Sequence, residues 1–148
     1  MSSTISSSLP VREAERARWV AELKSIVDQA EQWSRRQDWT VRRDSKPITE
    51  PMLGTYTVPV LLIHTPQGRL ILDPIGRDIV GAEGRIDLCV MPSYDPVPLV
   101  KGEHGWEFWS PQSQSPGRSW NEADFVAVAR EHSLIVADSI VKSSEDTA

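Results

Sequence analysis

The chain has 148 residues, of which 39% are hydrophobic and 25% charged, and its formal net charge is −5. This length suits one domain that buries about two-thirds of its unfolded surface. The composition argues against a disordered chain, and no apolar run approaches the ~20 residues of a bilayer span. The negative charge gives no general attraction to nucleic acid or to an anionic membrane, so we expect neither as a partner.

The N-terminal segment 1–9 is rich in serine and has no charged side chain. It lacks the basic and apolar regions of a signal peptide, so we interpret it as a disordered lead-in. Cys89 is the single cysteine of the sequence, which rules out an internal disulfide and makes the cytoplasm the expected location. The three histidines lie far apart and have no second ligand at metal-binding spacing, so we expect no metal and no cofactor.

A long amphipathic helix is predicted to begin at Ser8 or Leu9, because Pro10 follows and proline is favoured at the first helical position. Apolar side chains then recur at three- and four-residue steps at Trp19, Leu23, Ile26, Ala30 and Trp33. The pattern predicts a helix of about 25 residues with one buried face.

A basic cluster follows this helix and consists of Arg35, Arg36, Arg42 and Arg43. Cations at the C-terminal end of a helix complement its dipole, which is the structural interpretation. The alternative interpretation is a local contact with an anion or with nucleic acid.

Residues 54–109 consist of apolar stretches separated by short turn signals, with no helical pattern between them. Short connections favour antiparallel pairing, because parallel strands need crossovers of a dozen or more residues. A short first strand is predicted over residues 39–43, and two X-Pro steps predict a loop over residues 44–53. Pro59 has no N–H to donate, so we expect a bulge or a sheet edge there.

Several of these strands are apolar on both faces, as in Leu88–Met91, whereas a one-sided sheet would alternate. We therefore expect both faces of the sheet to be covered at one end, by two helices, by curling of the sheet or by a partner.

The C-terminal part is predicted to form a loop over 110–117 and then a second long helix. Ser119 and Glu122 have the spacing of a capping box, and helical periodicity continues to about Ile140. The predicted fold is α+β: an antiparallel meander of five or six strands flanked by one long N-terminal and one long C-terminal helix. It forms a single domain over 10–141, followed by a disordered tail over 142–148.

Candidate catalytic residues are few. Asp73, Asp87 and Lys101 lie on three successive predicted strands, and nucleases of the PD-(D/E)xK type place acids and a lysine on adjacent strands around a divalent ion. The Glu-x-Lys triplet of those enzymes is missing, and the structural interpretation is that these are ordinary residues near strand ends. Cys89 has apolar neighbours, which makes its thiol a poor nucleophile.

Tryptophan is abundant, with six residues, and three of them are candidates for a partner site: Trp106, Trp109 and Trp120. Period-two geometry sends Trp106 to one face of its strand and Trp109 to the other. If the first faces the core, the second points outward or under the 110–117 loop. Tryptophan is favoured at binding hot spots, but it also serves as a large core residue.

The sequence therefore favours a cytosolic, non-enzymatic interaction or accessory protein, whose partner is another protein or a second copy of itself. One alternative is a metal-dependent nuclease or hydrolase that uses the strand carboxylates. The other is a domain that holds a small apolar ligand between helix and sheet.

Overall fold

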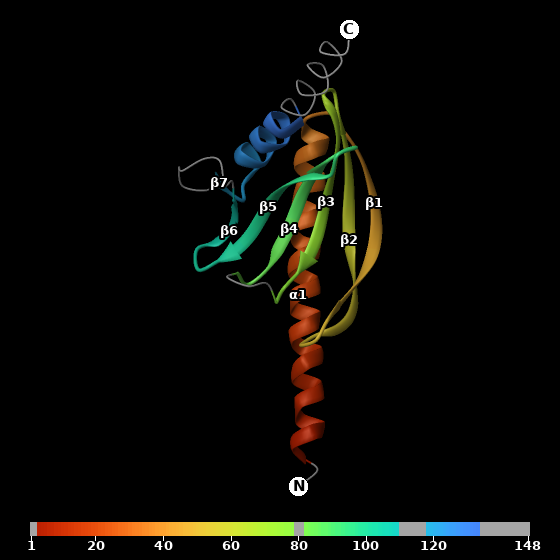
Figure 1. The fold of residues 1–148 in the computed structure, drawn as a ribbon, viewed down its shortest axis with the longest axis vertical. Coiled ribbons are helices and arrows are strands. Elements are labelled where there is room, and N and C mark those ends of the chain that lie inside the picture. Colours follow the sequence, from red (N-terminus) through yellow and green to blue (C-terminus); the bar gives the residue numbers. More distant parts are fainter. Residues whose placement is uncertain (1–2, 79–81, 110–117, 134–148) are drawn as a thin grey trace.

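The computed structural model describes residues 3–78, 82–109 and 118–133, with residues 3–9 described by their backbone alone. A seven-stranded sheet forms one layer, and helix α1 lies behind it in Figure 1. The elements are α1 (Ser3–Arg36), β1 (Thr40–Glu50), β2 (Gly54–Thr65), β3 (Gly68–Gly76), β4 (Arg85–Val90), β5 (Asp95–Gly102), β6 (Gly105–Phe108), β7 (Arg118–Ser119) and a C-terminal helix described over 122–133.

The sheet is an antiparallel meander in which each strand pairs with the next one in the sequence. This arrangement confirms the predicted α+β fold, with a helix before the sheet and a helix after it. The sheet has seven strands instead of five or six, because Arg118 and Ser119 pair with the end of β6 as a two-residue strand. Two residues give no periodicity, so the sequence pattern contains no signal for β7.

Helix α1 begins at Ser3 and not at the predicted Ser8 or Leu9, so it includes residues 3–9 of the predicted lead-in. Pro10 lies inside the helix. The fixed φ angle of proline is compatible with helical backbone, and its main cost is one missing hydrogen bond and a clash with the preceding turn. Pro10 therefore indicated a helix correctly, but its position did not mark the first turn of that helix.

The predicted loop over 44–53 is wrong for residues 44–50, which continue β1 to Glu50. Strand β1 is an edge strand, where a proline such as Pro47 can be accommodated. The register between β1 and β2 runs without a shift past Pro59, so no bulge forms there. Pro59 lies instead in the half of β2 that pairs with β1 alone, since the register with β3 starts at Leu61.

The two strands twist where β3 no longer supports them. Next to β3, the buried side chains of β2 lie at odd-numbered positions, Leu61 and Ile63. Nearer the hairpin tip they lie at even-numbered positions, Tyr56 and Val58, so the side of the strand that is buried changes between Val58 and Leu61. Two-stranded ribbons twist more strongly than wide sheets, which carries the tip of the hairpin around α1. The tip is fixed there by Arg16, whose guanidinium donates to the carbonyl of Leu53 (3.1 Å).

Both described helices pack on the same face of the sheet, so of the three expected ways to cover both faces, two helices on opposite faces is not observed among the described residues. Phe125 of the C-terminal helix contacts Trp33 and Trp39 at the end of α1, with ring centroids 5.7 and 6.5 Å apart. Figure 1 shows the described part of this helix beside the C-terminal part of α1. One core cluster therefore joins α1, the sheet and residues 125–129.

The C-terminal helix begins with a different cap from the predicted one. The Asn121 side chain accepts the backbone N–H of Asp124 (2.8 Å) and donates to its carboxylate (3.1 Å), whereas Ser119 belongs to β7. The predicted loop 110–117, the extension to Ile140 and the tail 142–148 lie outside the described residues. Within the described residues, no helix combines the length and the apolar character that a bilayer crossing requires.

Candidate functional site

The face of the sheet turned away from α1 carries the main candidate site. The core residues Leu72, Leu88 and Leu99 point toward α1, so their neighbours along each strand point away from it. We call this second surface the open face. Its central residues, related by the strand register, are Leu62, Ile71, Asp73, Arg85, Asp87, Cys89, Pro96, Pro98, Val100, Glu107 and Trp109. No described helix lies over it.

Trp109 is the exposed aromatic residue of this face. Its backbone N–H donates to the carbonyl of Pro98 (2.8 Å), which extends the pairing of β5 and β6 by one residue. Phe108 before it is buried, whereas the Trp109 side chain is 56% exposed. Trp109 therefore points away from the core, as expected once Phe108 faces it.

Charged side chains cross the middle of the open face. Asp73 and Asp87 are register partners on β3 and β4. Lys46 of β1 reaches Asp73 (2.5 Å), and the Arg85 guanidinium donates two hydrogen bonds to Asp87 (2.7 and 3.0 Å). Each carboxylate therefore has one cation of its own.

Cys89 lies next to these carboxylates and is buried, although it is not part of the core cluster. Burial, followed by the negative charges of Asp87 and Asp73, raises the pKa of its thiol to about 11. A thiol with this pKa is almost entirely protonated at neutral pH and reacts slowly. The structure thus agrees with the interpretation of Cys89 as a poor nucleophile.

The three candidate catalytic residues do not come together. Asp73 and Asp87 lie on the open face, whereas Lys101 is the register partner of Trp106 and pairs with Glu22 of α1 (2.7 Å) on the opposite face. The described residues also contain no group of three or more His, Cys, Asp or Glu side chains placed to hold a metal ion.

Two of the three candidate tryptophans pack against the core. Trp106 stacks on Trp19 with ring centroids 6.0 Å apart, and its indole N–H donates to Glu22 (3.0 Å). Trp120 contacts Phe125 (5.4 Å) and donates to Gln29 of α1 (2.8 Å). Both rings connect elements of the fold, which leaves Trp109 as the accessible member of the three.

Three of the four arginines in the basic cluster have carboxylate partners. Arg36 pairs with Glu122 (2.8 Å), Arg43 pairs with Asp28 and Glu31, and Arg35 lies 3.7 Å from Glu31. Among the described residues, Arg42 alone of the four has no ion-pair partner. The cluster therefore joins α1 to its neighbours, and no concentrated site for an anion results.

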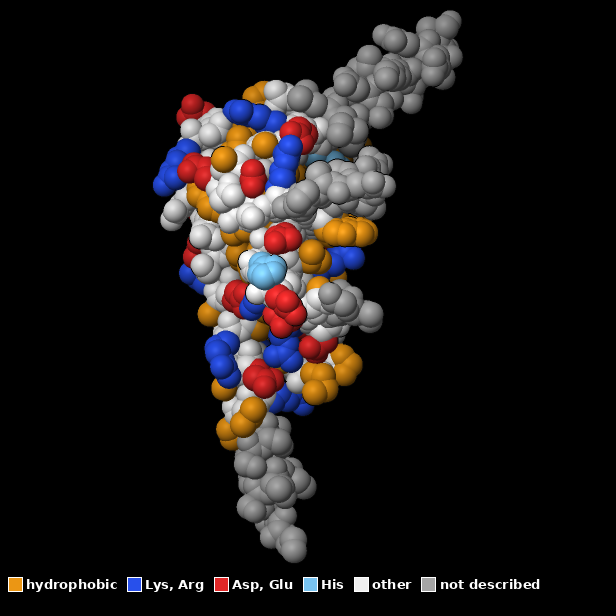
Figure 2. All heavy atoms as spheres, turned by 90° about the vertical axis from the view of Figure 1, so that its left-hand side faces the viewer, with side chains coloured by type: hydrophobic (Ala, Val, Ile, Leu, Met, Phe, Trp, Pro, Cys, Tyr) orange, Lys and Arg blue, Asp and Glu red, His pale blue; other side chains and the backbone are white. Residues whose placement is uncertain are grey.

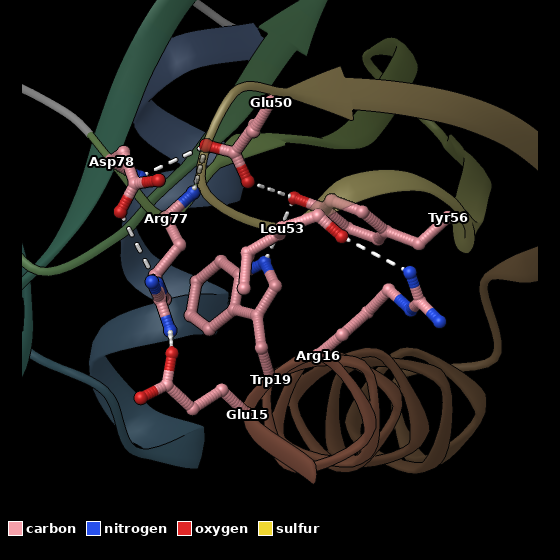
Figure 3. A network of polar contacts seen from close by, with 8 residues as sticks. All are labelled: Glu15, Arg16, Trp19, Glu50, Leu53, Tyr56, Arg77 and Asp78. Carbon is pink, nitrogen blue, oxygen red and sulfur yellow. Dashed lines mark hydrogen bonds and ion pairs between the residues drawn. The ribbon is translucent and has the colours of Figure 1, made fainter. Parts of the chain in front are cut away.

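A buried polar network that the sequence pattern does not indicate lies between the tip of the β1–β2 hairpin and the residues that follow β3, as Figure 3 shows. The Glu50 carboxylate accepts the backbone N–H groups of Arg77 and Asp78 (2.9 Å each) and the hydroxyl of Tyr56. The Tyr56 oxygen in turn accepts the indole N–H of Trp19 (3.0 Å). The predicted loop over 44–53 hid the role of Glu50, because nothing local in the sequence marks a loop glutamate as buried.

The network raises the pKa of Tyr56 above its ordinary value near 10, mainly through burial and then through the hydrogen bond to Glu50.

Beside this network, an open cleft of about 720 Å³ lies between α1 and the end of β3. Seven of its nine lining residues are charged, and Arg77 pairs there with Glu15 (3.5 Å). Figure 2 shows acidic and basic side chains intermingled on the surface seen from the β6 side.

Comparisons with known proteins give no further guide. The chain matches no family model, and neither a curated protein nor a solved structure shows significant similarity to it.

Proposed function

We propose that this chain is a cytosolic, non-enzymatic interaction protein that binds a protein partner, or a second copy of itself, through the open face. The observation that carries the proposal is Trp109, which is 56% exposed on a sheet face that no described helix covers. Tryptophan is enriched among the residues that dominate binding free energies at interfaces.

The neighbours of Trp109 support a protein contact. Leu62, Ile71, Pro98 and Val100 are half-buried and do not belong to the core cluster, so they offer apolar surface on the open face. Apolar surface around an exposed aromatic side chain is typical of interaction sites.

The chemistry of the same face supports a non-enzymatic role. Asp73 and Asp87 are engaged by Lys46 and Arg85, and the raised pKa of Cys89 makes the thiolate scarce at neutral pH. The nuclease alternative lacks support because its lysine lies on the other face. The apolar-ligand alternative lacks support because the cleft beside α1 is lined mainly by charged side chains.

The test compares Trp109→Ser with Met52→Ser, which removes another exposed apolar side chain (66% exposed) at the tip of the β1–β2 hairpin. Association is measured by light scattering of the purified protein and by quantitative affinity capture from cell extract. We expect Trp109→Ser to weaken association by at least about 2 kcal/mol, or roughly 30-fold in Kd, because anchors at interfaces reach this value. We expect Met52→Ser to associate normally.

Urea unfolding of both variants completes the test. An exposed side chain contributes little to folding, so each variant should keep the free energy of unfolding within about 0.5 kcal/mol of the wild-type value. A large loss of stability in Trp109→Ser with unchanged association would contradict the proposal, as would the absence of any specific association in the wild type.

A further inference from the structure

We infer that the open face receives a different protein, whose contact surface is apolar and carries a basic side chain that sits over Asp73 and Asp87 beside Trp109. This inference rests on the proposed function and narrows it from any protein partner to one of defined chemistry.

The first argument is the placement of two carboxylates opposite each other. Asp73 and Asp87 are direct register partners in an antiparallel pair, and like charges at such positions destabilise a sheet. Lys46 and Arg85 offset part of this cost from outside the pair. Positions where a sequence accepts a local cost are often functional, and a cation placed over the pair would relieve this one.

The second argument is the balance between negative and positive charges around Cys89, which lies on the open face. At the Cys89 sulfur, the charges of Asp87 and Asp73 raise the pKa more strongly than the charges of Arg85 and Lys46 lower it. At the position of Cys89, the two carboxylates therefore outweigh the two cations. The side chain of Asp73 remains 30% exposed, so an incoming cation can approach it.

The third argument separates a different protein from a second copy. Asp73 and Asp87 lie on β3 and β4, in the middle part of the seven-stranded sheet. In a symmetric dimer whose two copies meet through their open faces, the two-fold axis lies in the interface. If this axis passes near the centre of the open face, the acidic pair of one copy lies against the same pair of the other copy. Burying like charges together is costly, and the chain already carries a net charge of −5. A basic partner has the complementary charge.

Trp109 completes the surface. It lies beside Pro98, and Pro98 is the register partner of Asp87, so the acidic pair and the indole belong to one row across β3, β4, β5 and the end of β6. A lysine or arginine over the carboxylates could pack its aliphatic stem along Pro98 and Trp109.

The experiment titrates two model peptides into ¹⁵N-labelled full-length protein: a pentapeptide that alternates leucine with lysine, and its counterpart with glutamate. NMR shifts are read at the backbone amides of the open face and at the Trp109 indole, which is assigned by its absence in Trp109→Ser. We expect the lysine peptide alone to shift these signals, with an affinity that falls as salt is added.

Asp73→Asn should weaken the lysine peptide about two- to five-fold, which is the scale of one partly exposed ion pair. Glu103→Gln is the matched control, since it removes the same charge from an exposed turn outside the face, and it should bind normally. Light scattering should find the wild type monomeric at the concentrations used for NMR.

Equal binding of the two peptides, shifts confined to other surfaces, or a dimer whose contact includes Trp109 would each overturn the inference. If the peptides fail to discriminate while Trp109→Ser still loses a partner from cell extract, the charge argument falls and the proposed function stands. If Trp109→Ser also changes no association, both fall.

Discussion

The indole of Trp19 occupies the space that a side chain on Gly84 would need. A Cβ atom added to Gly84 would lie 2.4 Å from one ring carbon of Trp19 and 2.9 Å from another. The residue before β4 therefore has to be glycine for α1 to approach the sheet this closely, and the Trp19–Trp106 stack depends on that approach.

Gly84→Ala should lower the free energy of unfolding by about 1–3 kcal/mol, because an added methyl group overpacks a rigid aromatic contact. Gly102→Ala is the control, since nothing lies within 4 Å of its added Cβ and its change should stay within about 1 kcal/mol. Urea unfolding measures both. Equal effects of the two substitutions would show that the ring of Trp19 moves aside freely.

Tyr56 should make stability fall at alkaline pH. Its pKa is raised in the folded state, so above pH 10 the unfolded chain releases a proton that the folded protein keeps, and the free energy of unfolding decreases. Below pH 10 this contribution is constant. Cys89 adds a loss of the same sign from about pH 9. The comparison of wild type with Tyr56→Phe by urea unfolding from pH 8 to 11 isolates the tyrosine.

In Tyr56→Phe, the additional alkaline loss should disappear. At neutral pH this variant should be about 1–3 kcal/mol less stable than the wild type, because Glu50 and Trp19 each lose a buried hydrogen-bond partner. An identical alkaline slope in both proteins would contradict the prediction.

Cys89 should react slowly with iodoacetamide in the native protein at pH 8. A pKa of about 11 instead of 9.0 lowers the thiolate fraction roughly 100-fold, and burial slows access further. Asp87→Asn should speed the reaction, because it removes the charge with the larger effect on the thiol. Glu103→Gln should leave the rate unchanged. The rates are followed by mass spectrometry, and a fast native reaction in the wild type would refute the assigned environment.

Asn121→Ala should cost about 0.5–2 kcal/mol of folding stability, since it removes the side-chain oxygen that accepts the N–H of Asp124. Ser119→Ala should cost less, because Ser119 lies in β7 and is exposed. Thermal unfolding of the two variants decides between the observed cap and the capping box that the sequence suggests. A larger effect of Ser119→Ala would favour the latter.

The meander could be predicted because its signals are local: alternation within each strand and short turns such as the one that Thr65 and Gly68 close. The outward direction of Trp109 followed from the same period of two once Phe108 was placed in the core. Prolines misled the prediction at Pro10 and Pro47, where a helix and an edge strand accommodate residues that usually interrupt them.

The relations between distant residues could not be predicted. Glu50 finds its backbone partners 27 and 28 residues away, at the end of β3. The sequence grouped Lys101 with Asp73 and Asp87 as a candidate catalytic set, but the strand register places Lys101 on the other face of the sheet. Register between strands depends on tertiary packing, and one residue of shift exchanges the two faces.

The order of the elements also sets the order in which the chain can fold. Each hairpin of the sheet pairs neighbours in sequence, whereas the contacts that attach the last helix, such as Arg36–Glu122 and Gln37–Arg130, span 86 and 93 residues. Local pairings form faster than contacts that close long loops. During synthesis, Trp33 and Phe108 therefore remain without the covering rings of Trp120 and Phe125 until residues 120–125 have left the ribosome, and a chain that stops before residue 118 leaves this aromatic surface exposed.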